Sequence, residues 1–144
     1  MASSNLDNLV KIGHLKLETP AQSEIDGLMN GARARMKDAD HTVLSLESRF
    51  DLCYGAAHSL SLAALRWHGY RPDNRYAVFQ SLVHTTQLTS AQVRVLSDAH
   101  SRRNRIAYEG AEEVSQTLID SMMKVTKELL LQVEKLGPIT AKKS

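Results

Sequence analysis

Cysteine, proline and glycine are all scarce in this chain of 144 residues. The only cysteine is Cys53, which excludes a small scaffold held by disulfides and fits a reducing compartment. Three prolines and seven glycines are too few for an all-β domain with many tight turns. The length corresponds to one domain on the usual scale of roughly 100–200 residues, and a chain of this size can bury a core without covalent staples.

One-sided charge and long apolar runs are missing as well. Lys and Arg number 18 against 16 Asp and Glu, so the formal net charge is +2. This balance excludes a histone-like basic coat, and 42% apolar residues exclude a disordered chain. No apolar run reaches the roughly 18 residues of a membrane-spanning helix. The N-terminus lacks the basic and apolar regions of an export signal. We therefore expect a cytoplasmic protein without membrane contact.

Apolar residues recur at helical spacing along most of the chain. The strongest pattern steps by four and three residues from Leu46 to Trp67, which predicts a long helix with one packed face. Asp40 or Thr42 is expected to cap its start, and Gly69 to end it. The other predicted helices cover residues 21–37, 75–83, 90–108 and 112–136.

Short connections between these helices favour antiparallel neighbours, so the predicted fold is all-α, an antiparallel bundle of four to five helices over residues 21–137. Residues 1–20 are expected to form an N-terminal arm, either flexible or docked through a short strand or turn. Residues 138–144 are expected to form a flexible tail. Asp73 or Asn74 should cap the third helix, and Thr89 with Gln92 has the spacing of a capping box for the fourth. The residues expected on the buried face of the third helix are Tyr76, Phe79 and Val83.

Polar residues interrupt the core face of the helix predicted over 90–108. Its apolar stripe leads from Val93 and Leu96 into polar positions on the same face, because helical steps of three and four residues separate them. Arg103 should therefore be partly buried, which is costly unless it meets an anion or several acceptors. Arg102 and Arg105 point elsewhere and add positive charge at this helix end. The polar positions of the shared face are His100, Arg103, Asn104 and Tyr108.

Two interpretations of this basic segment stay open. It is either a solvated helix end that suits the C-terminal dipole, or an arginine fork for a phosphate, oriented by Asn104 and Tyr108. A polar row on the long helix is a candidate opposing surface, in which Asp51 would pair with Arg103 or accept a hydrogen bond from Tyr108. The alternative is an ordinary solvent-facing row. This row consists of Asp51, Tyr54 and His58.

The segment from Trp67 to Pro72 combines aromatic and basic residues. Such rings can stack on a nucleobase, but a tryptophan at the end of an apolar pattern more often caps the core, and we favour that interpretation. The histidines at positions 14, 41, 58, 68, 84 and 100 show no metal-ligand spacing, and no dinucleotide or nucleoside-triphosphate motif is present. We therefore expect no metal and no cofactor.

Two stretches of the sequence resemble the HEPN family, small helical domains that bind or cut nucleic acids. One stretch runs from Ser48 to Ala57 and leads to the segment from His68 to Arg71, and the other is 102–110, Arg-Arg-Asn-Arg-Ile-Ala-Tyr-Glu-Gly. The likeness spans roughly residues 42–136 and includes the order of the helices. It implies a homodimer in which two Arg-Asn motifs face each other across a cleft. In ribonuclease members of the family, such a cleft cuts RNA without metal, with the 2′-hydroxyl as nucleophile.

The resemblance implies roles for individual residues. Arg103 would stabilise the scissile phosphate and Asn104 would position it, while Arg102, Arg105 and His100 would add contacts to the RNA. Tyr108 stands where the family carries its catalytic histidine. An unperturbed tyrosine has a pKa of about 10, against about 6.5 for histidine, so it is a poor general base at neutral pH. It can still donate a hydrogen bond to a phosphate oxygen.

Two functions follow from this resemblance. The first is a metal-independent endoribonuclease of a toxin–antitoxin or defence module, with a composite site of Arg103, Asn104 and Tyr108 at a homodimer cleft. The second is a non-catalytic module that dimerises, or that docks a partner protein, RNA or nucleotide through the face of Arg103. The family also implies an antitoxin or a nucleotidyltransferase-fold protein as partner. A dimer would bring two basic helix ends together, so a nearly neutral protein can hold a small basic cleft.

Overall fold

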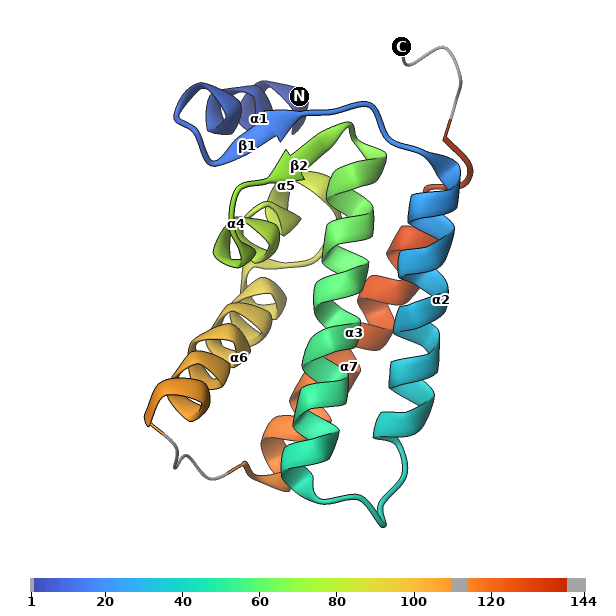
Figure 1. The fold of residues 1–144 in the computed structure, drawn as a ribbon, viewed down its shortest axis with the longest axis vertical. Coiled ribbons are helices and arrows are strands. Elements are labelled where there is room, and N and C mark those ends of the chain that lie inside the picture. Colours follow the sequence, from blue (N-terminus) through green and yellow to red (C-terminus); the bar gives the residue numbers. More distant parts are fainter. Residues whose placement is uncertain (1, 110–113, 140–144) are drawn as a thin grey trace.

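The body of the molecule consists of four long helices. The computed structural model describes residues 2–109 and 114–139 and is mostly helical. Two of the long helices, α2 and α6, run opposite to α3 and α7 (Figure 1). Helices adjacent in sequence are therefore antiparallel, as the short connections predict. The bounds of the four are α2 (Gln22–Ala39), α3 (Leu46–Trp67), α6 (Ser90–Glu109) and α7 (Gln116–Glu134).

Helix α3 lies at the centre because its apolar residues face partners on more than one side. It packs against α2 and α7, and it also contacts α4, α5 and α6. The predicted packed face is confirmed over its inner members, which are at most 1% exposed, whereas Leu46 and Trp67 at its two ends are half-buried. The cap predicted at Asp40 or Thr42 is wrong: Asp40 is the C-cap of α2, and the Ser45 side chain accepts a hydrogen bond from the Ser48 backbone N–H. The buried members of this face are Phe50, Cys53, Ala57, Leu60 and Ala64.

A glycine on α3 lets α2 approach closely. A Cβ atom at Gly55 would lie 3.1 Å from Cδ and 3.3 Å from Nε of Arg35, which belongs to α2. The stem of Arg35 therefore occupies the space that a larger residue would fill. The helical spacing of Ile25, Leu28, Met29, Ala32 and Met36 predicts one apolar face on α2, and these residues are buried except for Leu28, which is half-buried.

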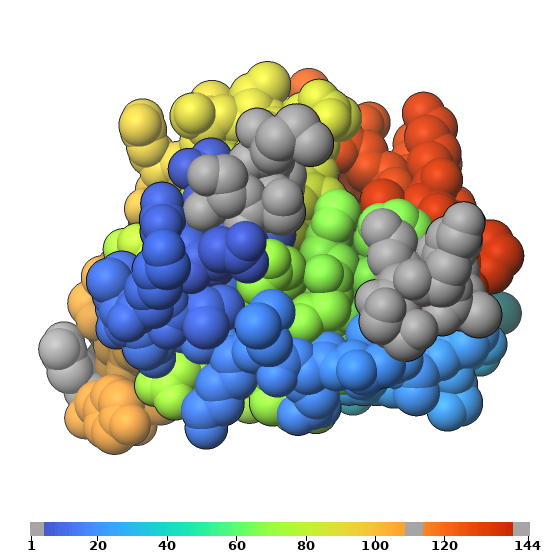
Figure 2. Space-filling model, turned by 90° about the horizontal axis from the view of Figure 1, so that it is seen from above, coloured from blue at the N-terminus to red at the C-terminus, as the bar shows by residue number. Residues whose placement is uncertain are grey.

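The N-terminal arm forms a helix and a strand. Helix α1 (Ala2–Lys11) leads to β1 (Leu15–Leu17), which pairs antiparallel with β2 (Tyr70–Pro72) just beyond α3. This matches the docked-strand alternative for residues 1–20. Leu6 and Leu15 are each only 1% exposed and form a second small core. Figure 2 looks down on this end of the molecule and shows the blue N-terminal segment lying over green residues of α3 and β2. The other members of the small core are Leu65, Tyr70 and Ala77.

The helix predicted over 75–83 is broken into two short helices, α4 (Arg75–Gln80) and α5 (Leu82–Thr85). The Asn74 side chain accepts a hydrogen bond from the Ala77 backbone N–H, which confirms Asn74 as the cap. Phe79 is buried as predicted, but Tyr76 is 51% exposed and Val83 is 43% exposed. The expectation for those two side chains is wrong. The chain turns at Ser81, so Val83 lies on α5 and does not share the face of α4 that buries Phe79, and Tyr76 lies in the first turn of α4, ahead of its buried residues.

The ends of α6 and α7 follow local capping chemistry. The Thr89 N–H donates to the Gln92 side chain and the Gln92 N–H donates to the Thr89 hydroxyl, so the predicted capping box is confirmed. Helix α7 begins at Gln116 under the cap of Ser115 rather than near position 112. Residues 112 and 113 lie outside the described part of the chain, as do residues 140–144 of the predicted tail.

Candidate functional site

The polar face of α6 meets α3 at His100. The Tyr54 hydroxyl lies 2.9 Å from His100 Nδ1, and the Asn104 amide nitrogen lies 3.3 Å from His100 Nε2. Because an amide nitrogen can only donate, Nε2 accepts, and the neutral ring carries its proton on Nδ1 and donates it to the Tyr54 oxygen. His100 is only 9% exposed. Both of its ring nitrogens are therefore engaged within the chain.

Arg103 lies on the outer side of this cluster. Its guanidinium carbon is 5.1 Å from the centre of the Tyr54 ring, a cation–π geometry that holds the charged group over a buried aromatic face. The side chain is half-buried, as its position on the core face of α6 predicts. Among the side chains that the structure describes, no carboxylate lies within ion-pair distance of Arg103. The predicted pairing with Asp51 is therefore wrong, and Asp51 is exposed.

Tyr54 and His58 do not form a solvent-facing row with Asp51. Tyr54 is 3% exposed and His58 is half-buried. Their ring centroids are 6.3 Å apart, and Phe79 of α4 packs 5.8 Å from Tyr54 and 5.9 Å from His58. The predicted supporting residues therefore divide: Tyr54 and His58 face α4 and α6, whereas Asp51 points to solvent.

Both histidines of the cluster are held neutral. Burial, followed by the nearby Arg75, His100 and Arg103, lowers the pKa of His58 to about 4. Burial, followed by Arg103 and Arg75, also lowers the pKa of His100. His58 Nε2 is inaccessible to solvent and has no hydrogen-bond partner among the described residues. At neutral pH, the positive charge of the cluster therefore belongs to the arginines.

Tyr108 does not join this cluster. It is 88% exposed near the end of α6, and no hydrogen bond or ring contact joins it to Arg103 within the described part of the chain. Arg105 is also exposed, and Arg102 is half-buried. One chain thus brings together Arg103, Asn104, His100, Tyr54 and His58, and leaves Tyr108 outside.

Helix α4 supplies residues that the sequence pattern did not single out for a site. Arg75 is exposed and close enough to both cluster histidines to lower their pKa values. The Tyr76 ring lies 6.3 Å from the His100 ring, centre to centre, with an angle of 36° between the planes. The available signal was the capping residue Asn74, which places Arg75 and Tyr76 together in the first helical turn.

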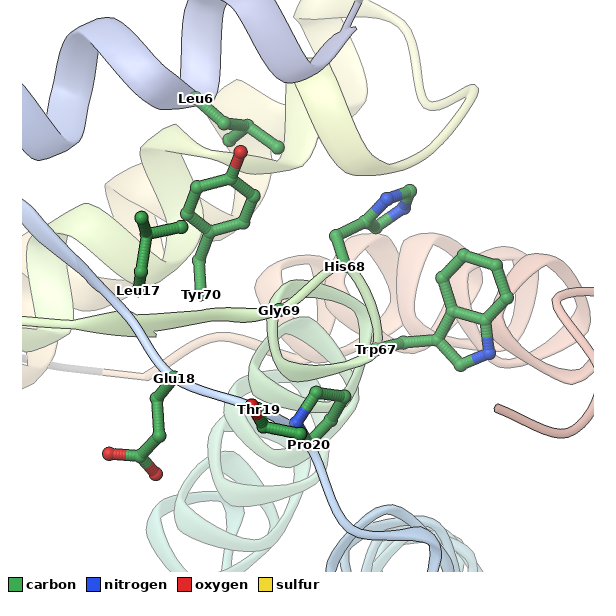
Figure 3. Close-up of a pocket in the computed structure, with 9 residues that line it drawn as sticks. All are labelled: Leu6, Leu17, Glu18, Thr19, Pro20, Trp67, His68, Gly69 and Tyr70. Carbon is green, nitrogen blue, oxygen red and sulfur yellow. The ribbon is translucent and has the colours of Figure 1, made fainter. Parts of the chain in front are cut away.

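A separate hollow of about 400 Å³ lies between the N-terminal arm and the end of α3 (Figure 3). Its Tyr70 ring points toward Leu6, and the Tyr70 hydroxyl donates to Asp7 at 2.6 Å. Burial and this contact raise the pKa of Tyr70 to about 12. Trp67 donates its indole N–H to the Gly137 carbonyl at 3.0 Å, in keeping with a capping role. The Tyr70 hydroxyl and the Trp67 indole N–H already have hydrogen-bond partners within the chain. We therefore place the candidate site at the α3–α6 cluster instead.

Comparisons of the chain with protein-family models, with curated proteins and with solved structures find no significant match. Within residues 2–109 and 114–139, no group of three or more His, Cys, Asp or Glu side chains is arranged to hold a metal ion. None of the helices in this described part combines the length and apolar character needed to cross a membrane.

Proposed function

We propose that this chain is a HEPN-like module that binds RNA and holds a backbone phosphate with Arg103. The observation that carries the proposal is the setting of the Arg103 guanidinium, which lies over the Tyr54 ring without a carboxylate partner among the described residues. A guanidinium has paired donors that match two phosphate oxygens. The Tyr54 ring limits the positions that the guanidinium can adopt, so less freedom is lost when a phosphate binds.

The state of the two histidines favours binding over cleavage. A general base must reach the proton that it removes and must have a free lone pair. Tyr54 and Asn104 occupy the two ring nitrogens of His100, and Nε2 of His58 is closed to solvent. The geometry therefore supports the non-catalytic alternative, with RNA as the ligand.

The proposal is tested by fluorescence anisotropy with an end-labelled single-stranded RNA at several salt concentrations. Arg103→Ala should weaken binding roughly 10- to 100-fold, which corresponds to the loss of about 1.5–3 kcal/mol for hydrogen bonds to a charged group. It should also reduce the slope of log K against log salt by about 0.7, the value for one phosphate of a single strand.

Arg33→Ala is the matched control because it removes the same charge from the α2–α7 side, where Arg33 pairs with Glu134 at 2.9 Å. Arg103→Lys keeps the charge without the fork and should bind with intermediate affinity. The proposal is wrong if the unaltered protein fails to bind RNA at low salt, or if Arg103→Ala binds as tightly as Arg33→Ala does.

A second candidate function, metal-independent RNA cleavage at a homodimer cleft, is favoured by one observation. Tyr108 is 88% exposed on the same helix as Arg103, so a second copy of the chain could pack against it. Cleavage of RNA in excess EDTA, with products ending in cyclic phosphates, would support this function. Tyr108→His should increase cleavage if the site lacks only its usual base. If neither protein cuts RNA, the binding function stands alone.

A further inference from the structure

The α4 edge of the candidate site carries an exposed aromatic ring on a firmly held backbone. Tyr76 is 51% exposed, whereas the next three residues of α4 are at most 3% exposed. The cap at Asn74 fixes the start of this helix. The Tyr76 ring is therefore accessible to a ligand, while the backbone of α4 that carries it is held by the buried residues and the cap. The three buried residues are Ala77, Val78 and Phe79.

Two arginines from different helices lie near His100, whose ring adjoins that of Tyr76. Arg75 precedes Tyr76 on α4, and Arg103 lies across on α6; both act electrostatically on the same pair of histidines, His58 and His100. Neither arginine has a carboxylate within ion-pair distance in the part of the chain that the structure describes. Among the described residues, neither of these two positive charges is neutralised by an ion pair, which leaves both available to a chain of phosphates.

The kinds of groups on this surface match what single-stranded nucleic acid presents. Proteins that bind single strands combine a positive track for the backbone with aromatic side chains on which bases stack. In a duplex the base faces are already stacked, so an exposed ring has no base face to meet. The Tyr76 ring lies beside His100, the neighbour of Arg103 on the polar face of α6, so base and phosphate contacts would be adjacent.

We propose that Tyr76 stacks on a nucleobase of single-stranded RNA whose neighbouring phosphates are bound by Arg75 and Arg103. This inference rests on the proposed function and adds to it single-stranded RNA as the class of ligand and Tyr76 as the residue that contacts a base. Because every base has a π-face, stacking on Tyr76 is expected to be tolerant of sequence.

The test compares Tyr76→Ala and Tyr76→Phe with the unaltered protein on two RNA oligomers of equal length. One oligomer carries all its bases, and the other has abasic sites throughout its central nucleotides. The unaltered protein should bind the abasic oligomer about 5- to 100-fold more weakly, the range for loss of one base stacked on an aromatic ring. Tyr76→Ala should bind the intact oligomer as weakly as the unaltered protein binds the abasic one, and should bind the two oligomers equally. Tyr76→Phe should retain the preference for bases, because stacking does not need the hydroxyl.

Leu131→Ala is the control, since it truncates a side chain that is 52% exposed on α7, away from the α4 edge. It should bind both oligomers as the unaltered protein does. Arg75→Ala should reduce the salt slope by about 0.7 and leave the preference for bases intact.

The stacking inference is overturned if Tyr76→Ala still prefers the intact oligomer, or if it loses affinity for both oligomers equally. These outcomes are distinct from failure of the proposed function, which is detected by Arg103→Ala. If Arg103→Ala loses binding while Tyr76→Ala keeps an unchanged preference for bases, stacking on Tyr76 is refuted and phosphate binding by Arg103 is still supported.

Discussion

Replacement of Arg66 by alanine should destabilise this protein more than any surface substitution. The Arg66 side chain is only 1% exposed at the end of α3. It donates to both carboxylate oxygens of Glu24, at 2.9 and 3.2 Å, and to one of Glu18 at 3.2 Å. It also donates to the backbone carbonyls of Glu18, Thr19 and Tyr70 at 3.0–3.2 Å. One guanidinium thus joins the N-terminal arm, α2, α3 and the start of β2.

The loss of stability in Arg66→Ala depends on which carboxylates and carbonyls lose Arg66 as a hydrogen-bond donor. Removing one member of a buried ion pair typically costs about 3–5 kcal/mol. Glu18 and Glu24 are 45% and 31% exposed, so water can solvate them in part, which favours the lower end. The Tyr70 carbonyl is buried and would lose the Arg66 donor. At roughly 2.1 cal/mol/K of unfolding entropy per residue, 144 residues give about 0.3 kcal/mol/K. A loss of about 3–5 kcal/mol then lowers Tm by about 10–17 °C.

The measurement is thermal and urea unfolding followed by circular dichroism. Arg71→Ala is the matched control, because Arg71 also contacts Glu18 but its side chain is 45% exposed. Exposed pairs contribute little in water, so Arg71→Ala should shift Tm far less. An Arg66→Ala protein that unfolds at the same temperature as Arg71→Ala would refute the account of Arg66 as the buried centre of this network.

Three further predictions concern residues of α3. Tyr54→Phe should lower the free energy of unfolding by about 1–3 kcal/mol, because it leaves the buried His100 Nδ1–H without its acceptor, and urea unfolding measures this loss. The pKa of His58 is about 4 in the folded protein and has its ordinary value of 6.5 in the unfolded chain, so between these pH values the unfolded chain binds a proton that the folded protein does not. The free energy of unfolding should therefore be highest above about pH 6.5 and should fall as the pH drops toward 4. His58→Gln should make the urea midpoint less dependent on pH over this range. Burial raises the pKa of Cys53 to about 11, so its thiol should resist an aromatic disulfide reagent in the folded protein and react fully in urea, as absorbance of the released thiolate will report.

Local chemistry in the sequence predicts most of the helices. The capping box of Thr89 and Gln92 and the cap at Asn74 act within three residues, so their position along the chain is enough to find them. The face of α3 is equally readable, since helical spacing decides which residues point the same way. The break at Ser81 was missed because the apolar spacing of 75–83 fits one helix as well as it fits two short ones.

The part of the candidate site that lies on α6 could also be predicted from helical spacing. Helical spacing places His100, Arg103 and Asn104 on one face of α6, and their position on the core side predicts the partial burial of Arg103. Spacing cannot tell that Tyr108 is 88% exposed, because the core that would have covered this face ends before it. Nor can it pair Tyr54 with His100, which lies 46 residues away in the chain.

The sequence by itself determined the helical class, most helix bounds and the basic face of α6, because these depend on hydrogen bonds and side-chain directions within a few residues. Only the tertiary structure decided which polar groups became partners. It buried Arg66 against carboxylates 42 and 48 residues away, and it placed Arg75 and Tyr76 beside His100. Such contacts depend on how the helices pack across the core, and periodicity along one helix carries no information about the residues that face it.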